Sequence, residues 1–443
     1  MSFTLLGILN SQAAGAAISY WLSLVGGSSA DNAYGVRADS DNNAYVNGKA
    51  QSAVVSGDNK ALLVKYDTDG AIQWQRGMSR SGNFFPSKLS VDSSGNVYAI
   101  ATTGEDGIVP AVAKYNSAGV LQWQKYYKEA FQNWCNDSVT DSSNNVILGG
   151  RQLIYGSSTF EFSIIKINSA GAIQWNQRLG GADIQEVTGV AVDSSDNVYF
   201  TGETSDDAGG ISGIFGVYSS SGVLQFQRRI PTNGGDNPQA IAVDSSANSY
   251  VVGQFRMPGE GTTQGAGIFK FNSFGTLQWQ KRLYTSNNEV FNGVAIDSEG
   301  NVYGAGTTPS EGAGTKILIA KYDSSGALQW QRSLGKDSTD TECTSIDIDS
   351  DDSLLLTGST DASGSGGDDY FTAKLPSDGS LTGSYTLDGQ VFVYAASSLT
   401  DQTNTKIIST SSFSTGTPSY VENSATANTG SESLTSYFVE VTG

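Results

Sequence analysis

The chain carries a sequence repeat with a period of 49 to 53 residues, and this period limits the fold more than any other feature. Its first marker is an aspartate-led turn such as Asp92-Ser-Ser-Gly-Asn96. The turn occurs seven times, beginning at Asp39, Asp92, Asp141, Asp193, Asp244, Asp297 and Asp349. Its second marker is an aromatic residue within a polar strand, as in Gln73-Trp74-Gln75-Arg76. Units of this length indicate a repeat architecture, because one unit alone cannot bury its apolar face.

Each unit reads as four short antiparallel strands, and helical periodicity is missing throughout. In the unit at 189–228 the predicted strands are Gly189–Val192, Val198–Gly202, Phe215–Tyr218 and Val223–Arg228. Asp, Ser, Asn and Gly form the turns, since Gly and Asn tolerate positive φ while Asp and Ser side chains bond the nearby backbone. Seven such units predict an all-β fold, namely a seven-bladed β-propeller of four-stranded antiparallel blades with a small C-terminal β appendage.

The recurring aromatic residue has a structural role in this prediction. A large ring on one face of every fourth strand suits a wedge between neighbouring blades, and its burial is worth about 2–3 kcal/mol. The predicted inter-blade aromatics are Trp21, Trp74, Trp123, Trp175, Phe226, Trp279 and Trp330. The basic residue two positions later, such as Arg76, can lie along a ring or pair with a turn carboxylate.

The propeller is predicted to span residues 17–385, between an N-terminal anchoring segment at 1–16 and a Ser/Thr-rich C-terminal β unit at 386–443. Ring closure has two alternatives. The strand around Trp21 has no blade before it and can complete the last blade, whereas Gly379–Tyr385 occupies the place of that blade's own fourth strand but lacks the Trp. We favour the N-terminal strand, which would protect both edges. The polar C-terminal unit has little core of its own and should pack on the propeller or on another subunit.

Charge and composition exclude several classes of function. The chain has 44 acidic and 25 basic residues and a net charge of −19, so a nucleic-acid backbone would be repelled. It contains no His, which removes His-based triads and His metal ligands. No apolar stretch approaches the roughly 18 residues of a membrane span. Cys135 and Cys343 are predicted to be free buried thiols, although one long-range disulfide is compatible with the count.

We predict no catalytic, cofactor-binding or metal-binding residue. Acidic turns such as Asp39–Asn43 and Asp347–Asp352 place oxygens at alternate positions, but turn chemistry explains them and the last Glu of an EF-hand loop is missing. Paired carboxylates for glycoside hydrolysis would have to come from acids outside the repeat. Those acids include Glu105, Glu129, Glu161, Glu186, Glu203 and Glu289. The sequence selects no pair among them, so the expectation is a protein that is not an enzyme.

The repeat also resembles a known family. The Asp-Ser-Ser-Gly-Asn-Val-Tyr element at 92–98, an apolar-Lys-Tyr-Asn-Ser-x-Gly element and the closing aromatic strand together resemble the SBBP-type seven-bladed β-propeller repeat. The resemblance extends over about residues 17–385. It implies the fold, and it implies little about function.

A second resemblance concerns the first residues. The segment Met1–Gly15 has a short apolar run without the basic region of a signal peptide, so we read it as part of the mature protein. It resembles the start of virion structural proteins of tailed phages, cyanophages in particular. The resemblance implies a homo-oligomeric tail or tail-fibre protein of the virion. Other tail proteins, and a host surface glycan or protein, would be its partners.

Two other classes remain open. One is a secreted or cell-surface bacterial β-propeller adhesin, and the other is a propeller polysaccharide lyase or glycosidase. A cleaved N-terminus would favour the adhesin. Release of reducing ends from envelope polysaccharide would favour the enzyme.

Overall fold

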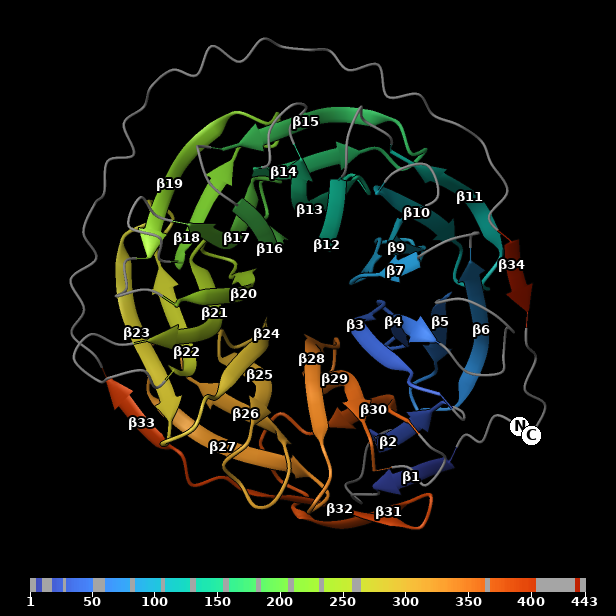
Figure 1. Cartoon of the computed structure of the whole chain (residues 1–443), viewed down its shortest axis with the longest axis vertical. Coiled ribbons are helices and arrows are strands. Elements are labelled where there is room, and N and C mark those ends of the chain that lie inside the picture. Colours follow the sequence, from blue (N-terminus) through green and yellow to red (C-terminus); the bar gives the residue numbers. More distant parts are fainter. Residues whose placement is uncertain are drawn as a thin grey trace.

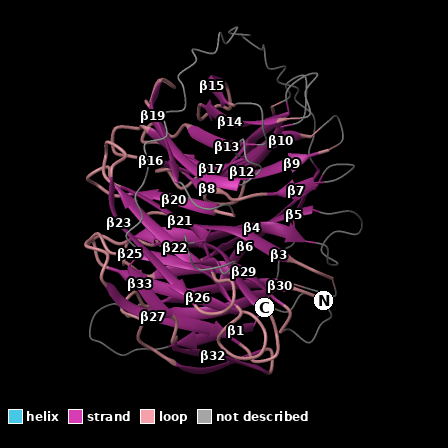
Figure 2. Cartoon of the chain, turned by 60° about the vertical axis from the view of Figure 1, so that its left-hand side comes forward, coloured by secondary structure: helices cyan, strands magenta, loops and turns pink. Residues whose placement is uncertain are grey.

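Seven antiparallel β-sheets surround a central axis, so the predicted seven-bladed β-propeller is confirmed (Figure 1). The computed structural model describes residues 5–9, 18–26, 29–50, 60–79, 84–104, 108–127, 133–153, 159–180, 185–205, 211–230, 235–256, 264–362, 367–403 and 435–438. Every regular element in these ranges is a strand (Figure 2). The described part of the chain therefore offers no helix that could cross a membrane.

In each blade the first strand lies nearest the axis and the fourth lies at the rim (Figure 1). Blade 1 contains β3 (Asn32–Ala38), β4 (Ala44–Ala50), β5 (Lys60–Tyr66) and β6 (Ile72–Ser79). Blade 2 contains β7 (Phe84–Pro86), β8 (Ser90–Val91), β9 (Val97–Thr103), β10 (Val109–Tyr115) and β11 (Leu121–Tyr126). Blade 3 contains β12 (Asn133–Thr140), β13 (Val146–Leu153), β14 (Phe160–Ile167) and β15 (Ile173–Leu179).

The remaining blades follow the same order. Blade 4 contains β16 (Gln185–Val192), β17 (Val198–Ser205), β18 (Ile211–Tyr218) and β19 (Leu224–Ile230). Blade 5 contains β20 (Asn237–Val243), β21 (Ser249–Arg256), β22 (Gln264–Phe271) and β23 (Leu277–Tyr284). Blade 6 contains β24 (Val290–Ile296), β25 (Val302–Thr308), β26 (Lys316–Tyr322) and β27 (Leu328–Gly335). Blade 7 contains β28 (Thr341–Ile348), β29 (Leu354–Thr360), β30 (Asp369–Leu375) and the N-terminal strand β2 (Tyr20–Val25).

The N-terminal strand closes the ring. Strand β2 pairs antiparallel with β30, with Trp21 opposite Lys374 and Val25 opposite Tyr370. Strand β1 (Leu5–Leu9), which lies within the predicted anchoring segment, then pairs with the outer side of β2. Of the two alternatives for closure, the structure therefore contains the N-terminal one.

The C-terminal residues add strands to the outside of the propeller. Strands β31 (Gly383–Leu387) and β32 (Gln390–Ala396) form a hairpin, and β32 pairs with β27 of blade 6. The alternative closing segment thus lies outside blade 6, and β31 runs across the expected domain boundary at residue 385. Strand β33 (Thr400–Thr403) extends blade 5, and β34 (Thr435–Phe438) extends blade 1. Residues 404–434 of the predicted C-terminal β unit lie outside the described residues.

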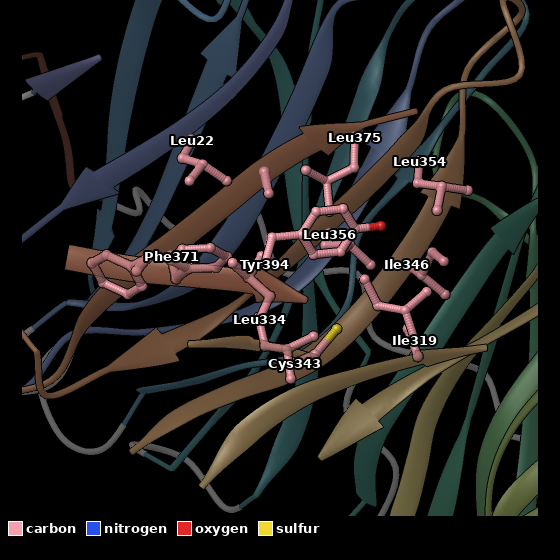
Figure 3. Packing of buried hydrophobic residues seen from close by; sticks show 14 of the residues in the cluster. Leu22, Ile319, Leu334, Cys343, Ile346, Leu354, Leu356, Phe371, Leu375 and Tyr394 are labelled. Carbon is pink, nitrogen blue, oxygen red and sulfur yellow. The ribbon is translucent and has the colours of Figure 1, made fainter. Parts of the chain in front are cut away.

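The hydrophobic core is divided among the interfaces between blades. One cluster unites Leu334 of blade 6, Cys343 and Phe371 of blade 7 and Leu22 of β2 (Figure 3). Tyr394 of β32 belongs to the same cluster and is 1% exposed. The C-terminal hairpin therefore packs as part of the propeller, with its buried side chains in the core of blades 6 and 7.

Each indole ring of the fourth strands packs on a turn of the following blade. The Trp74 Nε1–H donates to the Ser117 carbonyl at 3.1 Å, and an added Cβ at Gly119 would lie 2.7 Å from Trp74 Cδ2. Trp21 repeats the donation to the Thr68 carbonyl of blade 1 at 3.3 Å. Closure between the last and first blades thus uses the indole hydrogen bond found between internal blades.

Trp123, Trp175 and Trp279 make the same donation to the carbonyls of Ser169, Ser220 and Ser324. Phe226 and Trp330 lie close to Gly275 and Gly379 in the corresponding turns. All seven predicted aromatic residues therefore lie in rim strands, and six of them lie against a glycine of the next blade: Trp74, Trp123, Trp175, Phe226, Trp279 and Trp330. Of the two roles expected for the basic residue after the ring, Arg76 shows the contact with a ring. Arg76 stacks on Trp74 at 5.2 Å and donates through Nε to the Gly119 carbonyl at 2.6 Å.

The turn aspartates are engaged in the turns themselves. Asp92 Oδ1 accepts from the backbone N–H groups of Ser94 and Asn96 at 3.0 and 2.9 Å, and its Oδ2 accepts from the Tyr98 hydroxyl at 3.1 Å. Lys114 Nζ lies 3.4 Å from the same Oδ2. Burial alone would raise the pKa of Asp92, but the hydrogen bonds from Asn96 and the charge of Lys114 hold it below its usual value.

We predict that Gly119→Ala destabilises the propeller more than Gly300→Ala. Both glycines have positive φ, +73° and +81°, so each substitution carries the cost of a left-handed alanine, about 1–2 kcal/mol. Only at Gly119 would the added methyl group overlap an indole, because nothing lies within 4 Å of an added Cβ at Gly300. The overlap should lower the free energy of unfolding by about 1–3 kcal/mol more, as measured by urea denaturation. Equal losses for the two variants would contradict a contribution from ring docking.

Candidate functional site

The innermost strands carry a β-bulge at the same repeat position, five residues before the turn aspartate. The register shifts lie between Ala33 and Gly35, Cys135 and Asp137, Val187 and Gly189, Pro238 and Ala240, Phe291 and Gly293, and Cys343 and Ser345. In blade 2 the inner strand is interrupted here, after Pro86, which has no N–H to donate. A bulge leaves one residue unpaired and redirects its side chain. We call the seven residues at this position the bulge ring: Tyr34, Ser87, Asn136, Thr188, Gln239, Asn292 and Thr344.

Side chains of the bulge ring connect the inner strands of neighbouring blades. Asn136 Nδ2 donates to the Val187 carbonyl at 2.8 Å, and the Thr188 hydroxyl donates to the Pro238 carbonyl at 2.7 Å. Asn292 and Thr344 make the equivalent donations to the carbonyls of Cys343 and Ala33, at 2.7 and 2.8 Å. Each of these acceptors precedes the bulge-ring residue of the next blade. The bulges therefore supply carbonyls that join the inner strands of blades 3, 4 and 5 and of blades 6, 7 and 1.

A cavity of about 530 Å³ opens above the bulge ring, and all seven ring residues line it. Its wall comes from the residues two positions earlier in the inner strands of blades 2 to 5. These wall residues are Phe85, Trp134, Glu186 and Asn237. The volume lies within the range of small-molecule sites, about 300–1,000 Å³. This cavity, at one end of the central channel that the innermost strands surround, is therefore the candidate functional site. We call it the mouth of the channel.

Blades 3 and 4 bring an aromatic pair, a cation and a carboxylate together at this wall. Arg151 lies opposite Trp134 in the sheet, and its guanidinium stacks 4.8 Å from the rings of both Trp134 and Phe160. Arg151 Nη1 also donates to Glu186 Oε2 at 2.9 Å. Asn136 Nδ2 donates to the other oxygen, Oε1, at 2.7 Å. Glu186 is thus oriented by two donors, one of them charged.

A second carboxylate lies directly beside the first. Glu203 of β17 is the cross-strand partner of Glu186 in β16, so the two side chains project from the same face of the sheet. Burial and the nearby charge of Glu186 raise the pKa of Glu203 to about 7, while Arg151 opposes the shift. Glu203 therefore keeps its proton to a higher pH than an ordinary glutamate does.

Below the bulge ring a cross-axis ion pair occupies the channel. Arg37 of blade 1 lies 3.9 Å from Asp137 Oδ1 of blade 3, and Asp137 Oδ2 accepts the Val190 backbone N–H at 3.0 Å. On the other side, Asp347 of blade 7 accepts the Ala38 N–H at 2.8 Å. Burial raises the pKa of Asp347, and the charge of Arg37 opposes this shift. These charged groups form a polar floor under the cavity.

The acidic residues outside the repeat differ in their surroundings. Glu186 and Glu203 come together at the cavity. Glu289 is fully buried and accepts from the hydroxyls of Thr285 and Ser310, so it serves a local turn. Glu161 lies in β14, and Glu105 and Glu129 are outside the described residues.

The two cysteines are buried free thiols. Cys135 borders the cavity but is 5% exposed, and its Sγ contacts the Asp137 carbonyl at 3.5 Å. Burial raises the pKa of the Cys135 thiol to about 12, so it is protonated at neutral pH and is a poor nucleophile.

Sequence reasoning missed this site because the bulge hides the first half of each inner strand. The predicted first strand of blade 4 began at Gly189, and this was wrong, because β16 begins at Gln185. The omitted residues include Glu186 and Thr188. An extra residue at the bulge breaks the two-residue alternation from which a strand is recognised. A signal was nevertheless present, since the position five residues before each turn aspartate is polar in all seven units.

A comparison with protein-family models identifies the same repeat. Residues 174–207 match the family model of the SBBP β-propeller repeat, which confirms that the chain contains an SBBP-type repeat. A search of curated protein sequences finds no significant match.

Among solved structures, a gluconolactonase from Xanthomonas campestris is 13% identical with a TM-score of 0.39, over 84% of this chain and 98% of that one. Sqt1 from Chaetomium thermophilum is 13% identical with a TM-score of 0.44, over 76% and 82%. A mutant of puromycin hydrolase is 12% identical with a TM-score of 0.49, over 75% and 50%. Likeness at this level does not indicate a shared activity.

We predict that Glu203→Gln removes a pH dependence of stability. The pKa of Glu203 is about 7 in the folded state and about 4.3 when unfolded, so the folded state binds more protons between these values. The wild-type free energy of unfolding should therefore fall as pH rises through this window, by the contribution of Glu203. The variant should gain stability relative to the wild type between about pH 5 and pH 8.

Urea midpoints at the two pH values would measure this difference. A pH slope identical in the variant and the wild type would contradict the shifted pKa.

Proposed function

We propose that the chain is a non-enzymatic virion structural protein of a tailed phage, a tail or tail-fibre component whose propeller is displayed for assembly or host attachment. The observation that carries this proposal is the separation of strands β1 and β34 from the cavity. Strands β1 and β34 extend the adjacent blades 7 and 1 at the outer rim, while the cavity opens on the axis (Figure 1). A module held by its rim would present the channel mouth to a partner. The resemblance of Met1–Gly15 to virion proteins supports the placement in a phage particle.

The proposed partners follow from the same arrangement. Added strands at the rim satisfy backbone groups of blades 1, 5, 6 and 7, which is how one chain joins another by strand addition. Other tail proteins and further copies of this chain are the partners we propose for the rim. A host surface glycan or protein is the partner we propose for the exposed mouth. Nucleic acid is disfavoured by the net charge of −19.

One observation favours an enzyme as a second candidate. Glu186 and Glu203 are adjacent carboxyl groups in different environments, and glycosidases use such a pair as an acid and a base or nucleophile. Both oxygens of Glu186 already accept hydrogen bonds, from Asn136 and Arg151. This engagement favours a binding role for Glu186 over a role as nucleophile, and we retain the non-enzymatic proposal.

Immunogold electron microscopy of purified phage particles tests the proposal. An antibody against residues 386–443 should label the tail or its fibres, because part of this region lies on the rim. An antibody against an abundant host envelope protein serves as the control for adhering membrane. Unlabelled particles, with the protein in the host envelope or medium, would contradict the virion assignment and favour the secreted or cell-surface adhesin.

The non-enzymatic part has a separate test. Purified full-length protein should release no reducing ends or unsaturated products from host envelope polysaccharide. If products appear and Glu203→Gln abolishes them while Glu342→Gln does not, the protein is an enzyme. Glu342 is a suitable control because it occupies the position of Glu186 in blade 7, outside the cavity lining.

A further inference from the structure

We propose that the cavity at the channel mouth binds a neutral oligosaccharide, with Phe85 and Trp134 against the sugar rings and Glu186, Asn237 and Gln239 at the hydroxyl groups. The proposal deepens the proposed function and rests on it in one respect, namely that a surface glycan is a receptor suited to an attachment module. The binding chemistry itself comes from the residues of the cavity.

Two aromatic side chains on neighbouring blades give the wall an apolar surface. Phe85 lines the cavity and is 43% exposed, so part of its ring is accessible to a ligand. Trp134 is partly exposed, and its contacts with Phe160 at 5.2 Å and with Arg151 at 4.8 Å hold the ring in position. Rigid aromatic rings offer a large contact area with little loss of side-chain entropy on binding. The apolar C–H face of a pyranose ring is complementary to such a surface.

Polar groups of both kinds face the same space. Glu186 supplies carboxylate acceptors, and the amides of Asn237, Gln239 and Asn292 supply both donors and acceptors. The hydroxyl of Thr344 donates to the Ala33 carbonyl and can accept a hydrogen bond from a ligand. Neighbouring hydroxyl groups of a sugar each donate and accept, so a mixed set of carboxylates and amides matches them better than a set of like charges.

The balance of charge at the wall favours a neutral ligand over an ion. The guanidinium of Arg151 pairs with Glu186 at 2.9 Å, which offsets the charge of that carboxylate. Lys88 is a cation in the lining, and Glu203 is a second carboxyl group there, whose pKa is raised to about 7 by burial and by the charge of Glu186. A cationic ligand would meet Lys88, and an anionic ligand would meet Glu186. A polyhydroxylated neutral ligand meets no such repulsion.

The site is also preorganised. Asn136 holds the Glu186 carboxylate, and Asn136 and Thr188 of the bulge ring are bonded to carbonyls of adjacent blades. The pair of Arg37 and Asp137 lies below the ring. A rigid site avoids the entropic cost of ordering side chains when the ligand binds.

The test is glycan binding by the intact purified protein. A glycan array with neutral and acidic oligosaccharides is followed by calorimetric titration with the strongest neutral tetrasaccharide. We expect binding to neutral glycans, weakened at least about tenfold in Phe85→Ala and in Glu186→Gln. Glu342→Gln should bind within about twofold of the wild type, because Glu342 does not line the cavity. It is a matched control for Glu186→Gln, since Glu342 holds the same repeat position in blade 7.

Phe85→Ala is chosen as the aromatic variant because the exposed ring contributes little to folding, whereas truncation of Trp134 would also disturb Arg151 and Phe160. Thermal melting of each variant verifies that it is folded. Lack of binding to any neutral glycan, binding to acidic glycans alone, or binding unaffected by both cavity variants would each overturn the proposal. The immunogold result is independent, so labelled tails without glycan binding would retain the virion assignment and remove this site.

Discussion

The contact between an indole ring and a turn of the following blade joins the propeller into a ring. A blade of four short strands has two apolar faces, and each face is buried only against a neighbour. Trp74 covers Gly119 of blade 2 and bonds the Ser117 carbonyl, so one side chain provides both apolar contact and a hydrogen bond that fixes its direction. The glycine is required because its φ of +73° and its lack of a side chain allow the ring to approach the backbone.

The same contact explains why the N-terminal strand closes the ring. Without β2, blade 7 would expose the edge of β30, and blade 1 would have no indole over its turn at Thr68. Trp21 supplies both missing interactions from the beginning of the chain. Because Trp21 and Lys374 lie at opposite ends of the repeat, their pairing requires the blades between them to be in place. Closure is therefore expected late in folding, after the local pairing within each blade.

The sequence predicts the residues in the outer part of each blade, but it does not predict those near the axis. Trp74 and Asp92 recur in every unit in the same or a similar form, and their turn chemistry is local, so their positions could be predicted. The strand containing Glu186 and Thr188 could not be recognised, because the bulge interrupts its alternation. The pairing of Glu186 with Glu203 was beyond reach as well, since register depends on that bulge. The place of the segment 379–385, the less favoured alternative for closure, could not be predicted, because a strand added outside a blade has no periodic signal.

The contrast between rim and axis has a physical basis. At the rim, a residue such as Trp74 must fit the neighbouring blade, so the same solution is repeated around the ring. At the bulge ring, a short polar side chain that reaches the next carbonyl is sufficient, and Asn and Thr both meet this requirement.

Two residues earlier, the wall position makes no contact that the propeller requires in every blade. It holds Asn32, Phe85, Trp134, Glu186, Asn237, Val290 and Glu342 in the seven units. A position released from packing can vary between blades without disturbing the ring. Blades 2 to 5 thereby build one asymmetric wall, and an asymmetric wall is what recognition of a ligand without sevenfold symmetry requires.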